Sequence, residues 1–178
     1  AAAPNTDFVI YNIPQLDGVA LTMNLFAEMR KNPRVIGVKN SSMPVQDIQM
    51  FKQAGGADYI IFNGPDEQFI SGRVIGAEGA IGGTYGVMPD LFLKMDELVK
   101  AGRMEEACEI QYAVNEVIYK MCSARGNMYG DIKAILKRNE GLDLGSVREP
   151  LFPLVESDAA IVEEAAKMIE AARAKYLA

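Results

Sequence analysis

Four short apolar runs, separated by segments with helical periodicity, constrain the fold of this 178-residue chain more than any other feature. The runs lie at residues 8–12, 35–39, 59–63 and 79–83. Each run is continuous rather than alternating, which is typical of strands that are covered on both faces. Helical patterns separate them at residues 22–31, 44–54 and 66–76. This β–α repetition predicts a parallel α/β sheet with right-handed crossovers.

After residue 88 the pattern is helical throughout. It predicts helices over residues 89–100, 104–124, 130–138 and 158–176. We therefore divide the chain into two regions. Residues 1–88 hold four parallel strands with crossover helices, and residues 89–178 hold a first helix followed by a helical extension.

Four parallel strands alone would leave two unpaired sheet edges, which natural proteins avoid. They amount to half of an eight-stranded barrel. Either another segment or a second chain closes the sheet, or the chain is part of a longer protein. The opening residues 1–7 lack an initiator methionine and resemble the end of a helix and a turn. We therefore expect a fragment.

Composition excludes several classes of function. The net charge is −6, and no Lys/Arg run is present to neutralise phosphates, so we expect no nucleic-acid partner. No stretch approaches the roughly 20 apolar residues of a membrane span. The chain has no histidine, which excludes imidazole catalysis and most zinc sites. Cys108 and Cys122 fit no metal spacing, and reduced thiols without a signal peptide favour the cytoplasm.

One lysine stands out because it ends a buried apolar run. Lys39 follows Val35-Ile36-Gly37-Val38 and precedes the polar turn 40–42. Such a strand would deliver one amine to the barrel mouth, where (β/α) enzymes place their chemistry. Water-poor walls there would lower the pKa of the amine, and a neutral amine can form a Schiff base with a ketone. The alternative is a lysine that merely extends from a strand end into solvent.

Motifs at the ends of all four runs carry a family resemblance. They are Tyr11-Asn12-Ile13-Pro14, Gly37-Val38-Lys39-Asn40-Ser41-Ser42, Asn63-Gly64-Pro65-Asp66-Glu67 and Gly79-Ala80-Ile81-Gly82-Gly83-Thr84-Tyr85. In this order they resemble the N-acetylneuraminate lyase / dihydrodipicolinate synthase family of class I aldolases. The resemblance covers essentially the whole chain and implies strands five to eight of a (β/α)₈ TIM barrel, followed by a C-terminal helical bundle.

The resemblance also implies a chemistry. Family members bind a 2-oxo acid, usually pyruvate, as a Schiff base, and Lys39 matches the imine-forming lysine. Tyr11 matches the tyrosine that relays a proton between the bound pyruvate carboxylate and the aldehyde oxygen. A protonated imine withdraws electrons from the C–C bond that breaks, and a phenol can both accept and return a proton. No metal or cofactor is implied.

The turn after Tyr11 indicates the branch of the family. Dihydrodipicolinate synthases carry an arginine there, which holds the second substrate's carboxylate, whereas this chain has Gln15-Leu16-Asp17-Gly18. The turn resembles that of the sialic acid lyases instead. In that branch, residues matching six positions bind the substrate: Ser41, Gly64, Asp66, Glu67, Gly82 and Gly83.

Two positions depart from the lyase pattern. Pro65 stands where lyases commonly have tyrosine, and Gly83 where many have serine. Both lack a hydrogen-bonding side chain, which leaves the exact sugar acid open. Tyr129 is a further candidate for an aromatic wall of the pocket.

The leading hypothesis is a pyruvate-dependent class I aldolase that cleaves N-acetylneuraminate to pyruvate and the sugar aldehyde N-acetylmannosamine. Alternatives within the family are a dihydrodipicolinate synthase and a 2-keto-3-deoxy sugar acid aldolase, and a homotetramer is the family's usual assembly. The alternative of another class is a catalytically silent half-barrel. The family holds the pyruvate carboxylate with a Gly-Ser/Thr-Thr-Gly-Glu loop, which this chain lacks, so we expect little activity from the chain alone.

Simpler interpretations remain open for the other residues. Tyr11 could cap a strand with its ring in the core. Asp66 and Glu67 could be first-turn acids that the helix dipole favours, and this role is compatible with sugar binding. Gly82 and Gly83 could instead hold a phosphate in another kind of barrel enzyme.

Overall fold

The computed structural model describes residues 3–178, which form two compact units that divide after Gly82. We call the unit up to Gly82 the sheet unit and the unit Gly83–Ala178 the helical unit. The sheet unit contains β1 (Phe8–Asn12), α1 (Pro14–Asp17), α2 (Met23–Met29), β2 (Val35–Asn40), α3 (Gln46–Gly55), β3 (Ile60–Asn63), the 3-10 turn η1 (Asp66–Gln68), α4 (Phe69–Val74) and β4 (Gly79–Ala80). The helical unit contains the turn η2 (Thr84–Gly86), α5 (Pro89–Lys100), α6 (Met104–Cys122), α7 (Met128–Glu140), the turn η3 (Glu156–Asp158) and α8 (Ala159–Tyr176).

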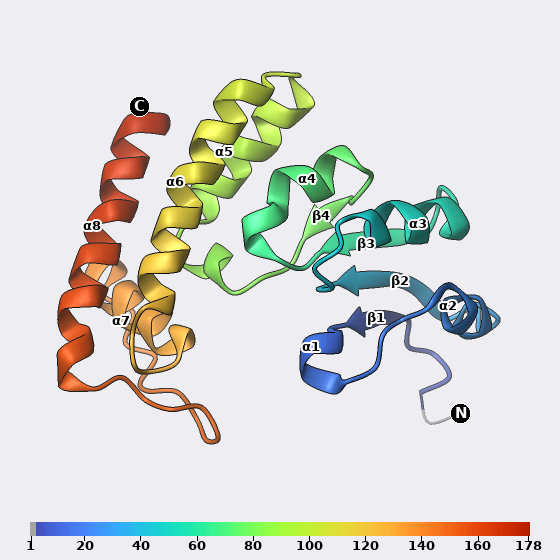
Figure 1. Cartoon of the computed structure of the whole chain (residues 1–178), viewed down its shortest axis with the longest axis horizontal. Coiled ribbons are helices and arrows are strands. Elements are labelled where there is room, and N and C mark those ends of the chain that lie inside the picture. The colour runs from blue at the N-terminus through green and yellow to red at the C-terminus, as the bar shows by residue number, and fades with distance from the viewer. Residues whose placement is uncertain (1–2) are drawn as a thin grey trace. The chain divides into compact units, whose positions relative to one another are not determined.

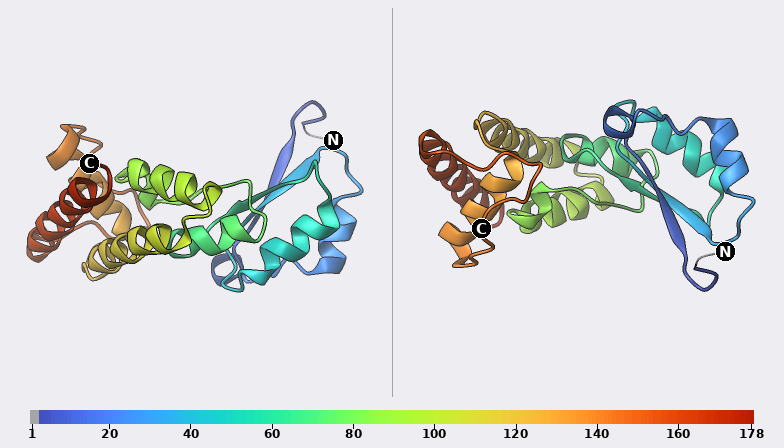
Figure 2. Two further views of the ribbon diagram at one scale, coloured as in Figure 1. Left: turned by 90° about the horizontal axis from the view of Figure 1, so that it is seen from above. Right: turned by 90° about the horizontal axis from the view of Figure 1, so that it is seen from below.

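The four strands form one parallel sheet in chain order, β1-β2-β3-β4 (Figure 1). Helices α2 and α3 lie together against one face of this sheet (Figure 2). The parallel α/β arrangement expected from the sequence is confirmed. Among the described residues, β1 pairs with β2 alone, so its other edge carries no strand.

The core of the sheet unit lies between the strands and these helices. Phe26 of α2 is fully buried, and its ring centroid lies 5.0 Å from that of Phe51 and 5.4 Å from that of Tyr59. Val38 and Ile61 contribute from the two central strands. Thr22 starts α2, because its hydroxyl accepts a hydrogen bond from the backbone N–H of Leu25 at 3.2 Å.

The fourth strand is shorter than expected. The sequence predicts a strand over residues 79–83, but the ladder contains only Gly79 and Ala80. The chain leaves the extended conformation after them, and Gly83 has helical dihedrals that lead into η2. Likewise, the helix expected over residues 66–76 begins as the 3-10 turn η1 and becomes α-helical only in α4.

In the helical unit, α6 packs against both α5 and α8, and α7 packs against α8 (Figure 1). The packed faces are apolar and contribute fully buried side chains from each helix, among them Leu91, Met95, Ile110, Met121, Ile135 and Ile169. No helix formed by residues 3–178 combines the length and the apolar character that a membrane crossing needs.

Two devices fix the helix ends of this unit. The Asp158 carboxylate accepts hydrogen bonds from the backbone N–H groups of Arg125, Gly126 and Val155 at 2.9–3.0 Å, which hold the turn before α7 beside the start of α8. These hydrogen bonds lower the pKa of Asp158. Gly141 ends α7 at φ +72°, a conformation that glycine adopts without a Cβ penalty.

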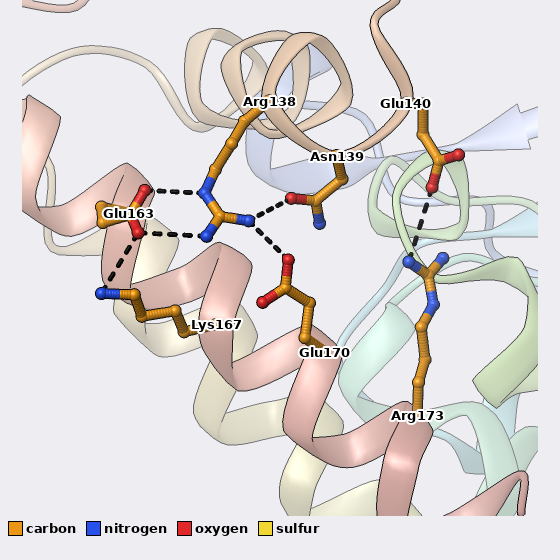
Figure 3. A network of polar contacts seen from close by, with 7 residues as sticks. All are labelled: Arg138, Asn139, Glu140, Glu163, Lys167, Glu170 and Arg173. Carbon is orange, nitrogen blue, oxygen red and sulfur yellow. Dashed lines mark hydrogen bonds and ion pairs between the residues drawn. The ribbon is translucent and has the colours of Figure 1, made fainter.

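Charged side chains fasten α7 to α8 (Figure 3). The Arg138 guanidinium donates to both carboxylate oxygens of Glu163, at 2.6 and 3.0 Å, and to Glu170 at 2.6 Å. Nearby, Arg173 of α8 forms an ion pair with Glu140, the last residue of α7, at 3.5 Å. The hydrogen bonds from Arg138 keep the pKa of Glu163 well below its ordinary value.

Candidate active site

The carboxyl ends of the parallel strands gather most of the residues that the sequence analysis singled out. Tyr11 of β1 and Lys39 of β2 are in register across the ladder. The Lys39 ammonium nitrogen lies 3.9 Å from the centre of the Tyr11 ring, which is a cation–π contact. Lys39 is half-buried, and Tyr11 is 50% exposed. An amine and a phenol therefore stand side by side at one edge of the sheet.

Backbone hydrogen bonds hold the strand ends together beyond the regular ladder. The N–H of Ser41 donates to the carbonyl of Asn12 at 2.7 Å, and the N–H of Gly64 donates to the carbonyl of Asn40 at 2.7 Å. The N–H of Ile81 donates to Asn63 in the same way at 3.0 Å. The segments that follow three of the strands are thus fixed to the neighbouring strand.

Two glycines allow close approaches within this region. A Cβ at Gly64 would overlap the hydroxyl oxygen of Ser41, so the absence of a side chain lets this hydroxyl lie against the turn after β3. A Cβ at Gly82 would overlap the carboxylate of Asp66, which is buried beside it. Glu67 follows in the same 3-10 turn and is half-buried.

Gly83 belongs to the helical unit and lies against the Tyr129 side chain there. A Cβ at Gly83 would stand 2.9 Å from Cε1 and 3.5 Å from the hydroxyl oxygen of Tyr129. The ring thus occupies space that a larger residue at position 83 would need. In the sheet unit the structure brings together Tyr11 with Lys39, Ser41 with Gly64, and Asp66 with Gly82.

The sequence analysis assigned no role to three asparagines that the structure places beside these residues. Asn12, Asn40 and Asn63 end β1, β2 and β3, and all three are buried. They are mutually in register across the sheet. The one available signal is position: Asn12 and Asn63 are the last residues of their apolar runs, and Asn40 directly follows the run at residues 35–39.

Comparison with known proteins identifies the family. Residues 1–169 match the profile of the dihydrodipicolinate synthetase family. The chain belongs to this family. It is 78% identical over 177 residues to an N-acetylneuraminate lyase of Mediterraneibacter gnavus, an alignment that covers 99% of this chain and 56% of that protein.

Solved structures of relatives share the fold. The structure of a catalytic lysine mutant of Ruminococcus gnavus sialic acid aldolase matches with a TM-score of 0.96 at 77% identity, covering 98% of this chain and 57% of that one. An N-acetylneuraminate lyase from Fusobacterium nucleatum, complexed with pyruvate, matches with a TM-score of 0.77 at 31% identity, covering 97% of this chain and 55% of that chain. The chain thus spans a little over half the length of these relatives.

Proposed function

We propose that the protein of which these residues form a part is a pyruvate-dependent class I aldolase that cleaves N-acetylneuraminate to pyruvate and N-acetylmannosamine. The contact between Lys39 and Tyr11 carries the proposal, because it sets an amine and a phenol side by side at the carboxyl edge of a parallel sheet. The high identity to an N-acetylneuraminate lyase and the catalytic lysine named in a relative support the same reaction.

In the proposed reaction Lys39 attacks the keto carbon of the sugar acid, and water leaves as the imine forms. The protonated imine accepts the electron pair of the bond between its α and β carbons, which breaks, leaving an enamine and releasing the sugar aldehyde. Tyr11 relays a proton in this step: its oxygen takes the proton of the hydroxyl that becomes the aldehyde oxygen, while its own phenolic proton passes to the carboxylate of the bound 2-oxo acid. Protonation of the resulting enamine and hydrolysis of the imine then release pyruvate and restore the lysine.

The remaining predicted residues would bind the substrate. Ser41 and Gly64 lie at the turns next to Lys39, and the acidic pair Asp66 and Glu67 would accept hydrogen bonds from sugar hydroxyls. Gly82 and Gly83 would bind the polyol through their backbone groups, because the Asp66 carboxylate and the Tyr129 ring occupy the space beside them. The half-barrel interpretation, with strands five to eight of a (β/α)₈ barrel, is part of the proposal, as are a homo-oligomer and a cytoplasmic location.

Reductive trapping tests the proposal. Borohydride added with pyruvate should attach the mass of one reduced pyruvate to Lys39, located by peptide mass spectrometry. The decisive sample is a chimera in which the half that the M. gnavus lyase has beyond the aligned region precedes these 178 residues. Lys39→Ala should lose both the adduct and N-acetylneuraminate cleavage, while Tyr11→Phe should keep the adduct and lower kcat about 10²-fold or more.

The isolated chain provides the comparison. We expect it to show little or no cleavage, because it lacks the Gly-Ser/Thr-Thr-Gly-Glu motif that holds the pyruvate carboxylate in the family. An unmodified Lys39 in an active chimera would refute the imine role. A substrate panel would separate the related activities on other 2-oxo acids.

A further inference from the structure

A chain of side-chain hydrogen bonds lies on the face of the sheet opposite to Tyr11 and Lys39. Side chains alternate along a strand, so Asn12 and Asn40, which follow these two residues, point to the other face. The Asn12 amide nitrogen donates to the Asn40 side-chain oxygen at 2.6 Å, across the two strands. Both asparagines are buried, with 4% and 0% exposure.

The chain continues from Asn40 to helix α3. The Asn40 amide nitrogen lies 2.9 Å from the Ser42 hydroxyl oxygen, and that hydroxyl lies 2.6 Å from a carboxylate oxygen of Asp47. At its other end, the Asn12 side-chain oxygen accepts from the backbone N–H of Leu21 at 3.1 Å. The hydrogen bonds thus connect the segment after α1, the strands β1 and β2, and the first turn of α3.

The Asp47 carboxylate sets the direction of every hydrogen bond in this chain. A hydroxyl has one proton, and the Ser42 hydroxyl oxygen lies 2.6 Å from the Asp47 carboxylate oxygen and 3.0 Å from the Asn40 side-chain oxygen, so the nearer, charged acceptor takes the proton. Asn40 then donates its amide to the Ser42 oxygen at 2.9 Å, and its own side-chain oxygen accepts from Asn12 at 2.6 Å. Asn12 must in turn donate its amide to that oxygen, which leaves its own oxygen for Leu21.

This hydrogen-bond geometry favours one register of β1 against β2. A shift of one residue would move Tyr11 to the opposite face of the sheet, and β1 is held by β2 alone among the described residues. The β1–β2 ladder already has one irregularity, between Phe8 and Val9. In any other register the buried amides of Asn12 and Asn40 would lose each other as partners, which is costly for buried polar groups.

We propose that Asn12 and Asn40, anchored through Ser42 to Asp47, form a register lock that positions the Tyr11 phenol ring against the Lys39 amine. The inference rests on the proposed function for its purpose, since that contact is the one the aldolase chemistry uses. Asn12, Asn40 and Ser42 are positioning residues, because they act through Tyr11 and Lys39, and the two asparagines lie on the other face of the sheet.

The test measures the Tyr11–Lys39 contact without any substrate. Reductive ¹³C-methylation of the intact chain gives one NMR signal per lysine, and the Lys39 signal is the one absent from Lys39→Arg. The Tyr11 ring shifts this signal upfield. The size of this shift is the difference between the chemical shifts of the Lys39 signal in the unsubstituted chain and in Tyr11→Leu. Asn12→Ala and Asn40→Ala should each lose more than half of this shift, and Ser42→Ala should lose a smaller part.

A matched control comes from the third asparagine. Asn63 is buried at the end of β3 and in register with Asn40, but its amide donates to the Pro65 carbonyl at 2.6 Å and takes no part in the lock. Asn63→Ala should therefore keep the full shift. A second control, Thr22→Ala, removes the cap of α2 and weakens the fold while leaving the lock intact.

The outcomes are distinct from those of the trapping experiment. Retention of the full shift in Asn40→Ala and Ser42→Ala would overturn the lock, as would an equal loss in Asn63→Ala or Thr22→Ala. If Asn12→Ala or Asn40→Ala fails to fold by circular dichroism, Ser42→Ala decides alone. If the shifts follow the prediction but pyruvate never attaches to Lys39, the proposed function fails while the register lock stands.

Discussion

In the sheet unit the buried polar side chains gather at the carboxyl ends of the strands, whereas in the helical unit they are dispersed among the helices and turns. Asn12, Asn40 and Asn63 stand in one row across the sheet. By contrast, Asp158 caps a turn, and Asp131 lies buried within α7. Buried polar groups that share one edge can hold functional side chains in register, whereas a dispersed one such as Asp158 joins only the segments around it.

One cation in each unit shows a further contrast, in the kinds of group that it contacts. In the helical unit, Arg138 reaches the carboxylates of Glu163 and Glu170 on α8. In the sheet unit, Lys52 of α3 bonds to the Glu78 carboxylate and also donates to two backbone carbonyls, those of Ala57 and Tyr59, at 3.0 and 2.9 Å. Lys52 thus combines an ion pair with backbone contacts, whereas Arg138 joins α7 to α8 through ion pairs alone.

The largest predicted effect concerns the apolar core of the sheet unit. It tests whether this core, rather than the row of Asn12, Asn40 and Asn63, stabilises the unit. Phe26→Ala removes a fully buried ring that contacts Phe51 and Tyr59. It should lower the free energy of local unfolding by about 3–5 kcal/mol, because it deletes buried surface and leaves a cavity. Hydrogen exchange of the β2 amides measures this. Phe8→Ala, at a ring that is 46% exposed, should cost less than half as much, and equal losses would contradict the argument.

The second prediction concerns the helical unit, where a substitution should raise rather than lower the free energy of unfolding. Asp131 is fully buried, and neither of its carboxylate oxygens has a hydrogen-bond partner within residues 3–178. Burial, together with the Asp158 carboxylate, raises the pKa of Asp131 to about 6. In the unfolded chain this pKa is near 3.9. The folded state therefore favours the protonated form of Asp131, and the charged carboxylate lowers the free energy of unfolding.

The pH window follows from these two values. Below about pH 4 Asp131 is largely protonated in both the folded and the unfolded state, so it does not lower the free energy of unfolding. As the pH rises to about 6, stability falls, and above that it is lower by a constant amount. Asp131→Asn should therefore raise the unfolding free energy by about 1–3 kcal/mol at pH 7–8 and by little at pH 4. Urea denaturation at both pH values measures it.

A surface acid of the same unit serves as the control for Asp131→Asn. Hydrogen bonds from Lys137 and from the backbone N–H of Gly145 lower the pKa of Asp143. Asp143→Asn should therefore slightly destabilise the protein at neutral pH, which is the opposite sign. A stabilisation by Asp131→Asn that is equal at pH 4 and pH 8 would show that the charge is not its cause.

The regular elements were largely predictable from the sequence. The run at residues 8–12 is confirmed as β1, and the helix at residues 89–100 as α5, because β-branched runs and amphipathic spacing act locally. The strand expected over residues 79–83 was too long, since Gly82 and Gly83 carry no side chain that favours extended backbone.

The polar architecture of the site was only partly predictable. Tyr11 and Lys39 were found through strand-end motifs, and their contact depends on a register that no local pattern encodes. Asn12 and Asn40 resemble ordinary turn residues in sequence, and their burial arises only when neighbouring strands align them. The buried position of Asp131 likewise depends on which face of α7 packs inward.

The smallest predicted effect concerns Arg138→Ala, which removes the ion pairs that join α7 to α8 (Figure 3). Since these charges are solvent-accessible, the midpoint of thermal unfolding should fall by only about 1–3 °C at low salt. Most of this difference should vanish in 1 M NaCl, where the screening length is roughly 3 Å. Scanning calorimetry of both proteins at the two salt concentrations measures it.

Lys52→Met in the sheet unit is the matched comparison for Arg138→Ala. Methionine retains much of the aliphatic stem of Lys52 but cannot donate to the carbonyls of Ala57 and Tyr59. These carbonyls are dipoles held at short range, so their hydrogen bonds to Lys52 respond less to screening than charge pairs at the surface do. The loss in Lys52→Met should therefore persist in 1 M NaCl. If salt removed both losses equally, Lys52 and Arg138 would not differ in how they stabilise their units, because the Lys52 contribution would then come from its pair with Glu78 alone.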